Sequence, residues 1–383
     1  MHLSPYRPDK NHWDTIIIGG GQAGLATGYF LKQLKQEFII LDESEKTGDS
    51  WRNRWDSLRA FTPGWTNGLP GMPFPGPKNA FPSKDEIASF LAKYKETFDL
   101  PVIYCSPVSE MVKSDSFFEV IAGDKKYFAK TVVVATGNFA LPKMPAFSAE
   151  LNPGIRQLHS STYLSPSAIA DGDVLIVGAG ISGLQIALDL ASGNRTVYVA
   201  GKPPAKIPDF IFKYLGHQFV WFARNILNTR TPIGRKARHA ILSKGKGAPL
   251  IKISLEEVLK KGVIHLGRIA GVHEGWPITV DGKEIHINTT IWCTGFLPNY
   301  SWIKLQDILD GAGYPLTNRG VSSVIEGLFF AGSMFQYSLT SVWIGGVGRD
   351  AEFIAGKITD YNKRNQPIKS MIPDTGLYPK LSR

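Results

Sequence analysis

Apolar side chains concentrate in short unbroken runs, each followed by a glycine-rich turn and then by spaced apolar positions. The first run is Thr15–Ile18 and the second covers residues 173–177. Runs of this length without polar alternation are typical of strands buried on both faces of a parallel sheet. The spacing of Leu25, Tyr29 and Leu31 after the first turn predicts an amphipathic helix. The pattern therefore predicts two strand–turn–helix units.

The rest of the chain carries further signals of regular structure. Residues 84–98 predict a helix, because apolar positions recur at helical spacing behind an N-cap at Ser83 and a capping-box partner at Glu86. The segment 51–82 is rich in proline, glycine and aromatic residues, which predicts a long functional loop. Further strands are expected at 102–104, 117–121, 127–128, 131–137, 290–296 and 327–332, and a last helix from Ile344.

Both glycine turns have the spacing of a phosphate-binding loop. They are formed by Gly19, Gly21 and Gly24, and by Gly178, Gly180 and Gly183. In such a turn the first glycine makes the bend, the second lets the backbone approach a pyrophosphate, and the third lets helix and strand pack closely. One turn alone is a weak signal. Two turns in the same context predict two bound dinucleotides.

The repeated patterns indicate the organisation of the chain. The run 290–296 repeats the pattern of 131–137, so we expect the chain to leave a first lobe and later return to it. The predicted fold class is α/β, with two Rossmann-like dinucleotide-binding domains, the second inserted in the first. The expected parts are residues 13–165 and 289–360 for the first domain, 166–288 for the second with an insertion at about 203–252, and a C-terminal tail over 361–383.

The residue that ends the next strand differs between the two units. Asp42 follows the first unit, where a carboxylate can accept hydrogen bonds from an adenosine ribose, which fits FAD or NAD. Lys202 follows the second unit, where a cation can pair with a 2′-phosphate, which fits NADPH better than NADH. An ordinary loop carboxylate and an ordinary surface lysine remain the alternatives. NADH therefore stays open as the second ligand.

Composition is that of a globular enzyme of 383 residues, with 43% apolar and 20% charged residues. The two cysteines, Cys105 and Cys293, are far apart and form no CxxC pair, which argues against dithiol-disulfide chemistry. No histidine or cysteine spacing suggests a bound metal. No apolar run approaches the length of a membrane span, and the first residues lack an apolar signal core, so a cytoplasmic location is expected.

Positive charge is concentrated in one stretch. The net charge is +10, and residues 202–252 contain eleven basic residues and one acid, Asp209. This stretch is either an attractive surface for NADPH, an anionic substrate or a membrane, or a solvated surface of the insertion. Its aromatic part, 210–222, predicts a helix that packs into the core or touches a membrane. No motif for nucleic-acid binding is present.

These residues together resemble the glutathione-reductase-like flavoproteins with two dinucleotide sites, and within them the flavin-containing monooxygenases. Besides the two glycine turns and Asp42, the resemblance rests on a Gly-x-x-Trp-Arg segment, an Ala-Thr-Gly turn after residue 134 and a Cys-Thr-Gly-Phe-x-Pro segment. It covers nearly the whole chain. It implies FAD as one cofactor and NADPH as the other, with nucleotide contacts also at Gly48, Trp51, Arg52, Thr136, Gly137, Gly295 and Gly332.

Two segments depart from the family pattern. The Phe-x-Gly-x-x-x-His signature is only partial, because Pro153 replaces the phenylalanine and the glycine is shifted to Gly154, while His159 keeps its place. An asparagine that helps to hold the oxygenated flavin in some members corresponds to Phe61 here, and Ser333 replaces an acidic residue. Less tightly coupled oxygenation is expected.

The resemblance also implies an activity. Hydride passes from NADPH to FAD, O2 adds to give a C4a-(hydro)peroxyflavin, and one oxygen atom goes to a sulfide, an amine or a ketone. The partners are then O2 and a small molecule, and Phe61 and His159 are the candidate catalytic residues. His159 would orient the nicotinamide nucleotide or couple the two domains, with a purely structural role as the alternative. Phe61, Trp65 and Trp343 are candidates for an aromatic-lined substrate pocket, with core packing as the alternative. A reductase or oxidase, and a slow redox sensor, remain alternatives. Oligomeric state stays open, a dimer included.

Overall fold

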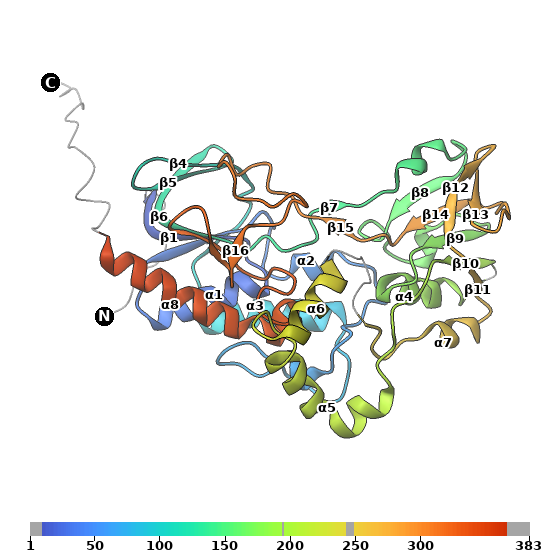
Figure 1. Ribbon diagram of the computed structural model, residues 1–383, viewed down its shortest axis with the longest axis horizontal. Helices are drawn as coiled ribbons and strands as arrows, with labels where there is room; N and C mark the ends of the chain where they lie inside the picture. Colours follow the sequence, from blue (N-terminus) through green and yellow to red (C-terminus); the bar gives the residue numbers. More distant parts are fainter. Residues whose placement is uncertain (1–9, 194, 243–248, 366–383) are drawn as a thin grey trace.

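The computed structural model describes residues 10–193, 195–242 and 249–365. Two sheets built around parallel strands lie at opposite ends of the molecule, with helices packed against both (Figure 1). The predicted mixed α/β class is confirmed.

The first sheet has nine strands, and the first glycine turn directly follows its strand β1. Its continuous order is β16-β17-β18-β6-β1-β2-β3, and β4 and β5 extend it beside the first half of β6. The pairs that join β18, β6, β1, β2 and β3 are parallel, so the carboxyl ends of these strands share one edge. The strands are β1 (His12–Ile18), β2 (Phe38–Leu41), β3 (Val102–Ile103), β4 (Val108–Lys113), β5 (Phe118–Ala122), β6 (Lys125–Val134), β16 (Thr317–Asn318), β17 (Val321–Ser322) and β18 (Leu328–Phe330).

The second sheet has five strands, all parallel, in the order β11-β10-β9-β14-β8. Its strands are β8 (Arg156–His159), β9 (Val174–Val177), β10 (Val197–Ala200), β11 (Ile264–Leu266) and β14 (Thr289–Trp292). A hairpin of β12 (Ile269–His273) and β13 (Trp276–Thr279) lies beside it. The sequence analysis placed the start of the second domain at residue 166. β8 lies before that boundary and yet belongs to the second sheet.

Two antiparallel segments connect the sheets. They are β7 (Leu141–Pro142) and β15 (Phe296–Leu297), which pair with each other between the two ends of the molecule (Figure 1). The chain leaves the first sheet along β7 and returns along β15. The run 290–296 was expected in the returning part of the first domain, but its first half forms β14, which pairs with β8 and β9 in the second sheet.

The helices cover the sheets and the space between them. The predicted helix after Ser83 is confirmed with its capping box: Ser83 Oγ accepts from the Glu86 N–H, and Glu86 accepts from the Ser83 N–H. The last helix continues four residues into the segment 361–383 that the sequence assigned to a tail. The helices are α1 (Gln22–Gln33), α2 (Asp49–Arg52), α3 (Lys84–Thr97), α4 (Ile181–Leu190), α5 (Asp209–Asn225), α6 (Pro232–Leu242), α7 (Leu255–Leu259) and α8 (Gly348–Arg364).

Separate apolar cores hold the two sheets, and each glycine turn lies where its core meets the strand ends. One core packs α1, α3 and α8 against the first sheet, and another packs α4 and α7 against the second. Trp51 packs against both cores. No helix among the described residues combines the length and apolar character needed to cross a membrane.

Candidate functional site

The first glycine turn has three glycines with three different surroundings. Gly19 has φ +106° and packs against the Ala135 carbonyl, and a side chain at Gly24 would collide with the Gly19 carbonyl. A side chain at Gly21 would meet no described atom within 4 Å. Gly21 is also the N-cap of α1, and no described side chain caps that helix. The fold therefore needs Gly19 and Gly24, whereas Gly21 borders open space in front of free helix N–H groups, which fits a bound pyrophosphate.

The second turn repeats these surroundings. Gly178 has φ +117° and packs against the Cys293 carbonyl, and a side chain at Gly183 would collide with the Gly178 carbonyl. A side chain at Gly180 would meet nothing within 4 Å among the described residues, and Gly180 is the uncapped N-cap of α4. The two turns thus present the same open cradle at the carboxyl ends of two different sheets.

Asp42 lies beside the first cradle. Its carboxylate accepts hydrogen bonds from the N–H of Gly20 and, at 2.8 Å, from the N–H of Ser44. These bonds hold the carboxylate at the end of β2 next to the turn. The geometry thus gives Asp42 a role in shaping the turn, and its contact with a ribose stays a prediction.

Lys202 lies beside the second cradle. It is exposed and follows Gly201, whose φ is +117° and whose side-chain position faces the Ala179 N–H at 3.5 Å. His265 Nε2 contacts the Gly201 carbonyl at 2.8 Å and so fixes this corner. Gly201 therefore lies against the second turn, and Lys202 is the next residue along the chain.

Other predicted contact residues gather at the shared edge of the first sheet. Thr136 is exposed, and Gly137, at φ +78°, has open space at its side-chain position. Gly332 packs against α1, since a side chain there would lie 2.7 Å from Ala23 Cβ. The sequence analysis missed Asn138, whose Nδ2 donates to the Gly332 carbonyl at 2.9 Å and so joins the turns after β6 and β18.

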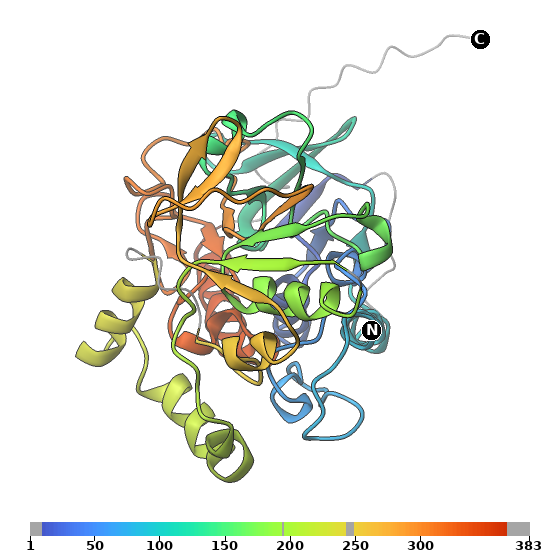
Figure 2. The same cartoon turned by 90° about the vertical axis from the view of Figure 1, so that its right-hand side faces the viewer.

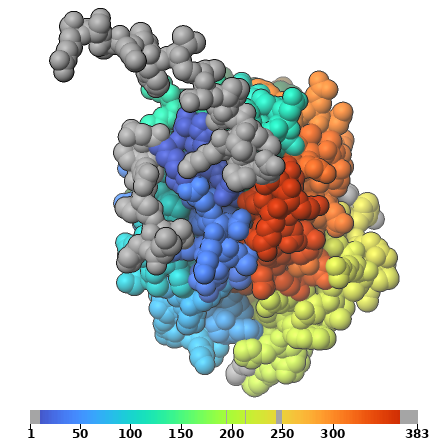
Figure 3. Space-filling view, turned by 90° about the vertical axis from the view of Figure 1, so that its left-hand side faces the viewer, coloured from blue at the N-terminus to red at the C-terminus, as the bar shows by residue number. Residues whose placement is uncertain are grey.

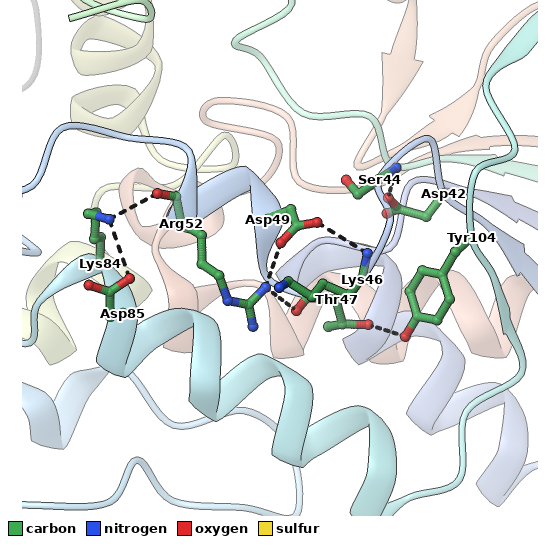
Figure 4. Close-up of polar contacts among 9 residues, drawn as sticks. All are labelled: Asp42, Ser44, Lys46, Thr47, Asp49, Arg52, Lys84, Asp85 and Tyr104. Carbon is green, nitrogen blue, oxygen red and sulfur yellow. Dashed lines mark hydrogen bonds and ion pairs between the residues drawn. The ribbon is translucent and has the colours of Figure 1, made fainter. Parts of the chain in front are cut away.

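The segment around α2 is held mainly by its own contacts (Figure 4). Gly48 has φ +97° and a side chain there would lie 2.6 Å from the Ala88 carbonyl oxygen, so packing on α3 explains the glycine. Arg52 donates to Asp49 Oδ1 at 2.6 Å and to the Thr47 carbonyl at 3.0 Å. The Arg52 guanidinium therefore has partners within its own segment, and its role as a flavin contact stays a prediction.

Arg54 is a second residue that the sequence analysis missed, although it stands two positions after Arg52. No carboxylate among the described residues forms an ion pair with it, and burial lowers its pKa. Its guanidinium lies 5.8 Å from the Phe139 ring centre and 5.6 Å from that of Phe296. It lines a cavity of about 260 Å³ between the two sheets, together with Ser44, Ser50, Asn53 and Ser161. Glu43 and Asp49 also line this cavity, and Asp49 is already paired with Arg52. The partly buried Arg54 guanidinium is therefore the group in this cavity that an anion could pair with.

His159 lies at the connection between the sheets. It is 5% exposed, its Nδ1 accepts from the Ser161 N–H at 3.2 Å, and its Nε2 donates to the Gly295 carbonyl at 3.0 Å. Its ring packs edge-on against Phe296, with the ring centres 4.7 Å apart. The imidazole thus contacts both the end of β8 and the segment just before β15, and its role toward a bound nucleotide stays a prediction.

We expect His159 to make stability depend on pH. Burial lowers its pKa below 6.5, the positive charge of Arg54 adds to this, and the bond to the Gly295 carbonyl opposes it. Because the unfolded histidine takes up a proton more readily than the folded one, its contribution to stability is present at neutral pH and is lost as the pH falls below about 6.5. In urea unfolding, the wild type should lose free energy of unfolding more steeply below that pH than His159→Gln. Parallel pH profiles would contradict the assignment.

A second cavity of about 500 Å³ lies between the long loop, α5 and the segment before α8. Its walls include Trp65, Met72, Val220, Arg224 and Trp343. Two of the three aromatic residues predicted for a substrate pocket thus face one cavity. The third, Phe61, packs edge-on against Trp343, with the ring centres 6.1 Å apart. The walls mix apolar side chains with polar groups, and Arg224 is the one cation among the residues that line the cavity.

Neither cysteine forms a disulfide. Cys105 is exposed, whereas Cys293 lies against the second glycine turn, where burial raises the pKa of its thiol to about 12. Such a thiol is a poor nucleophile at neutral pH.

Comparison with known proteins places this geometry in context. The family model described as pyridine nucleotide-disulphide oxidoreductase matches residues 16–207. An uncharacterized CzcO-like oxidoreductase from Geobacillus kaustophilus is 39% identical over 349 residues, which cover 91% of this chain and 99% of the relative. An indole-3-pyruvate monooxygenase, YUCCA1, from Oryza sativa is 26% identical over 85% of this chain and 86% of the relative.

Solved structures give the same picture. A variant of a flavin monooxygenase from Stenotrophomonas maltophilia is 25% identical with a TM-score of 0.77, covering 92% of this chain and 99% of that one. A bacillithiol disulfide reductase from Staphylococcus aureus, at 16% identity, covers 92% of this chain and 100% of that one with a TM-score of 0.66, which shows the shared fold alone. The resemblance to flavin-containing monooxygenases expected from the motifs is confirmed.

Proposed function

Because the chain belongs to the pyridine nucleotide-disulphide oxidoreductase family, we propose that it is an FAD-dependent monooxygenase that consumes NADPH and O2 and oxygenates a small molecule. The first glycine turn would hold FAD and the second NADPH, so that each sheet forms one dinucleotide-binding unit and the chain passes between them at β7 and β15. The observation that carries the proposal is the duplicated cradle, with Gly21 and Gly180 each facing open space at an uncapped helix.

Three features favour oxygenation over disulfide reduction. Cys293 has a strongly raised pKa, and it forms no pair with Cys105. The relatives at 25% and 26% identity with known names are monooxygenases. The 500 Å³ cavity with Trp65 and Trp343 in its walls has the size and lining of a small-molecule site.

The residues of the chain would act by binding and positioning. Flavin chemistry, when the group is bound, supplies hydride acceptance and activation of O2. The helix N-termini behind Gly21 and Gly180 would hold the two pyrophosphates, and Asp42 would accept from the adenosine ribose. Arg54, between the two units, would neutralise a phosphate group. The 500 Å³ cavity would hold a sulfide, an amine or a ketone against its aromatic side chains, and Arg224 in its wall could pair with a carboxylate on that substrate.

Turnover tests this function directly. Purified, FAD-loaded protein is incubated with NADPH, O2 and a panel of sulfides, tertiary amines and 2-oxo acids, and both the oxygenated product and hydrogen peroxide are quantified. We expect at least one class of substrate to yield oxygenated product. The amount of hydrogen peroxide should then fall by the amount of product formed. Peroxide equal to the NADPH consumed, with every class, would favour the oxidase or reductase alternative.

The preference for NADPH should depend on Lys202. Replacing Lys202 with alanine removes the cation beside the second turn, so we expect the KM for NADPH to rise roughly tenfold, as for loss of one charge-assisted hydrogen bond. The KM for NADH should change little, because NADH lacks the 2′-phosphate. Steady-state kinetics with both nucleotides measures this. Lys206→Ala, four positions away, is the matched control, and equal effects of Lys202→Ala on both nucleotides would remove the phosphate role.

A further inference from the structure

The insertion between β10 and β11 forms an arm of two helices, α5 and α6, that projects from the body of the molecule away from both sheets (Figure 2). A bridge between Lys206 and Leu250 closes its base. Its inner side is fixed to the body by backbone hydrogen bonds, from the Leu339 N–H to the Leu227 carbonyl at 2.9 Å and from the Thr229 N–H to the Tyr337 carbonyl at 2.8 Å. The arm is therefore a built part of the fold with a defined outer side.

That outer side presents large apolar groups to water. Phe210 is 56% exposed, Tyr214 68%, Trp221 59% and Ile233 59%. Four of the five strongly exposed aromatic side chains in the described chain, counting Phe222, belong to α5. One prediction from the sequence was that this helix packs into the core. The exposed side chains show that it does so only in part. An exposed aromatic cluster of this kind indicates a contact surface.

The same arm carries the excess positive charge of the protein. Outside residues 202–252 the chain has equal numbers of basic and acidic residues, so the net charge of +10 comes from that stretch. On α6 and the preceding turn, Arg230, Arg235, Lys236 and Arg238 are exposed. The single acid of the stretch, Asp209, is paired with Lys206 at 3.0 Å. In Figure 3 the arm forms the lower right edge of the molecule.

Aromatic groups beside exposed arginine and lysine match the boundary of an anionic membrane. Tyrosine and tryptophan rings settle at the level of the lipid headgroups, and cations pair with the phosphates and carboxylates there. A second copy of the chain fits less well, because two arms would bring like charges together. We propose that the α5–α6 arm docks the protein on the surface of membranes that contain anionic phospholipids. This inference is independent of the proposed redox function.

Sedimentation with vesicles tests the docking. Full-length, flavin-loaded protein is mixed with vesicles of phosphatidylcholine alone and of phosphatidylcholine with phosphatidylserine. We expect pelleting with the second kind only, reduced by added salt. The double variant Phe210→Ser with Trp221→Ser, and separately Arg235→Glu with Lys236→Glu, should each weaken the partition coefficient roughly tenfold or more.

A matched control comes from an apolar residue elsewhere. Val280 is 71% exposed directly after β13, away from the arm, and Val280→Ser should pellet like the wild type. An unchanged melting temperature and flavin spectrum show that the variants are folded. The proposal is overturned if the wild type does not pellet with phosphatidylserine vesicles, or if the arm variants pellet as well as it does. It is also overturned if the arm variants only convert a dimer to a monomer in light scattering.

Discussion

Replacing Gly180 with valine should abolish reduction of the flavin by NADPH while FAD stays bound. The Gly180 backbone has φ −80° and ψ −174°, which valine adopts without strain, and a side chain there meets no described atom within 4 Å. The fold is therefore kept, but the side chain fills the space where the nicotinamide dinucleotide would contact the helix N-terminus. Loss of two phosphate contacts corresponds to about a 100-fold rise in the Kd for NADPH. Anaerobic titration with NADPH, followed by dithionite, separates loss of binding from loss of flavin.

Two comparisons make this result specific. Gly183→Ala should instead lower the melting temperature, because its side chain would collide with the Gly178 carbonyl. Gly356→Ala, where an added methyl group meets nothing within 4 Å on α8, should be reduced by NADPH like the wild type and should not lower the melting temperature. If Gly180→Val is reduced by NADPH as readily as the wild type, the second turn is not the nicotinamide site.

The corresponding substitution in the first turn, Gly21→Val, should prevent binding of FAD. Gly21 has φ −75° and ψ −173° and also faces open space, so Gly21→Val should fold. Its side chain would occupy the pyrophosphate position, and we expect purified protein that has lost its yellow colour, with the Kd for FAD raised at least about 100-fold. Flavin content per protein chain and the far-ultraviolet circular dichroism spectrum measure the two effects. Full flavin occupancy in a folded variant would show that this turn does not bind FAD.

The glycine turns could be predicted from the sequence because their conformation is set locally. Gly19 and Gly178 must adopt positive φ, and Gly24 and Gly183 must lie against a carbonyl of their own turn, so residue type and spacing specify the geometry. The helix after Ser83 was predictable for the same reason, since its capping box lies within four residues.

Properties that depend on tertiary packing could not be predicted in this way. Arg52 and Arg54 are equivalent in sequence terms, yet the turn of α2 brings Asp49 to Arg52 and leaves Arg54 facing a cavity between the sheets. The aromatic residues of α5 favoured a core-packed helix on sequence grounds, with a surface helix as the alternative. Tertiary contacts determine which side of the helix is covered: Gly216 and His217 pack on Trp65 of the long loop, and the chain just after α5 bonds to residues 337–339.

The proposed function requires that the NADPH-reduced enzyme pass one oxygen atom from O2 to a substrate. The most direct measurement is a stopped-flow experiment in which anaerobically reduced enzyme is mixed with O2 while the flavin spectrum and peroxide release are followed. We predict a transient spectrum that differs from both reduced and oxidised flavin and that decays faster when a sulfide, an amine or a ketone is added. A single-step return to oxidised flavin, with peroxide equal to the NADPH consumed, would contradict the claim.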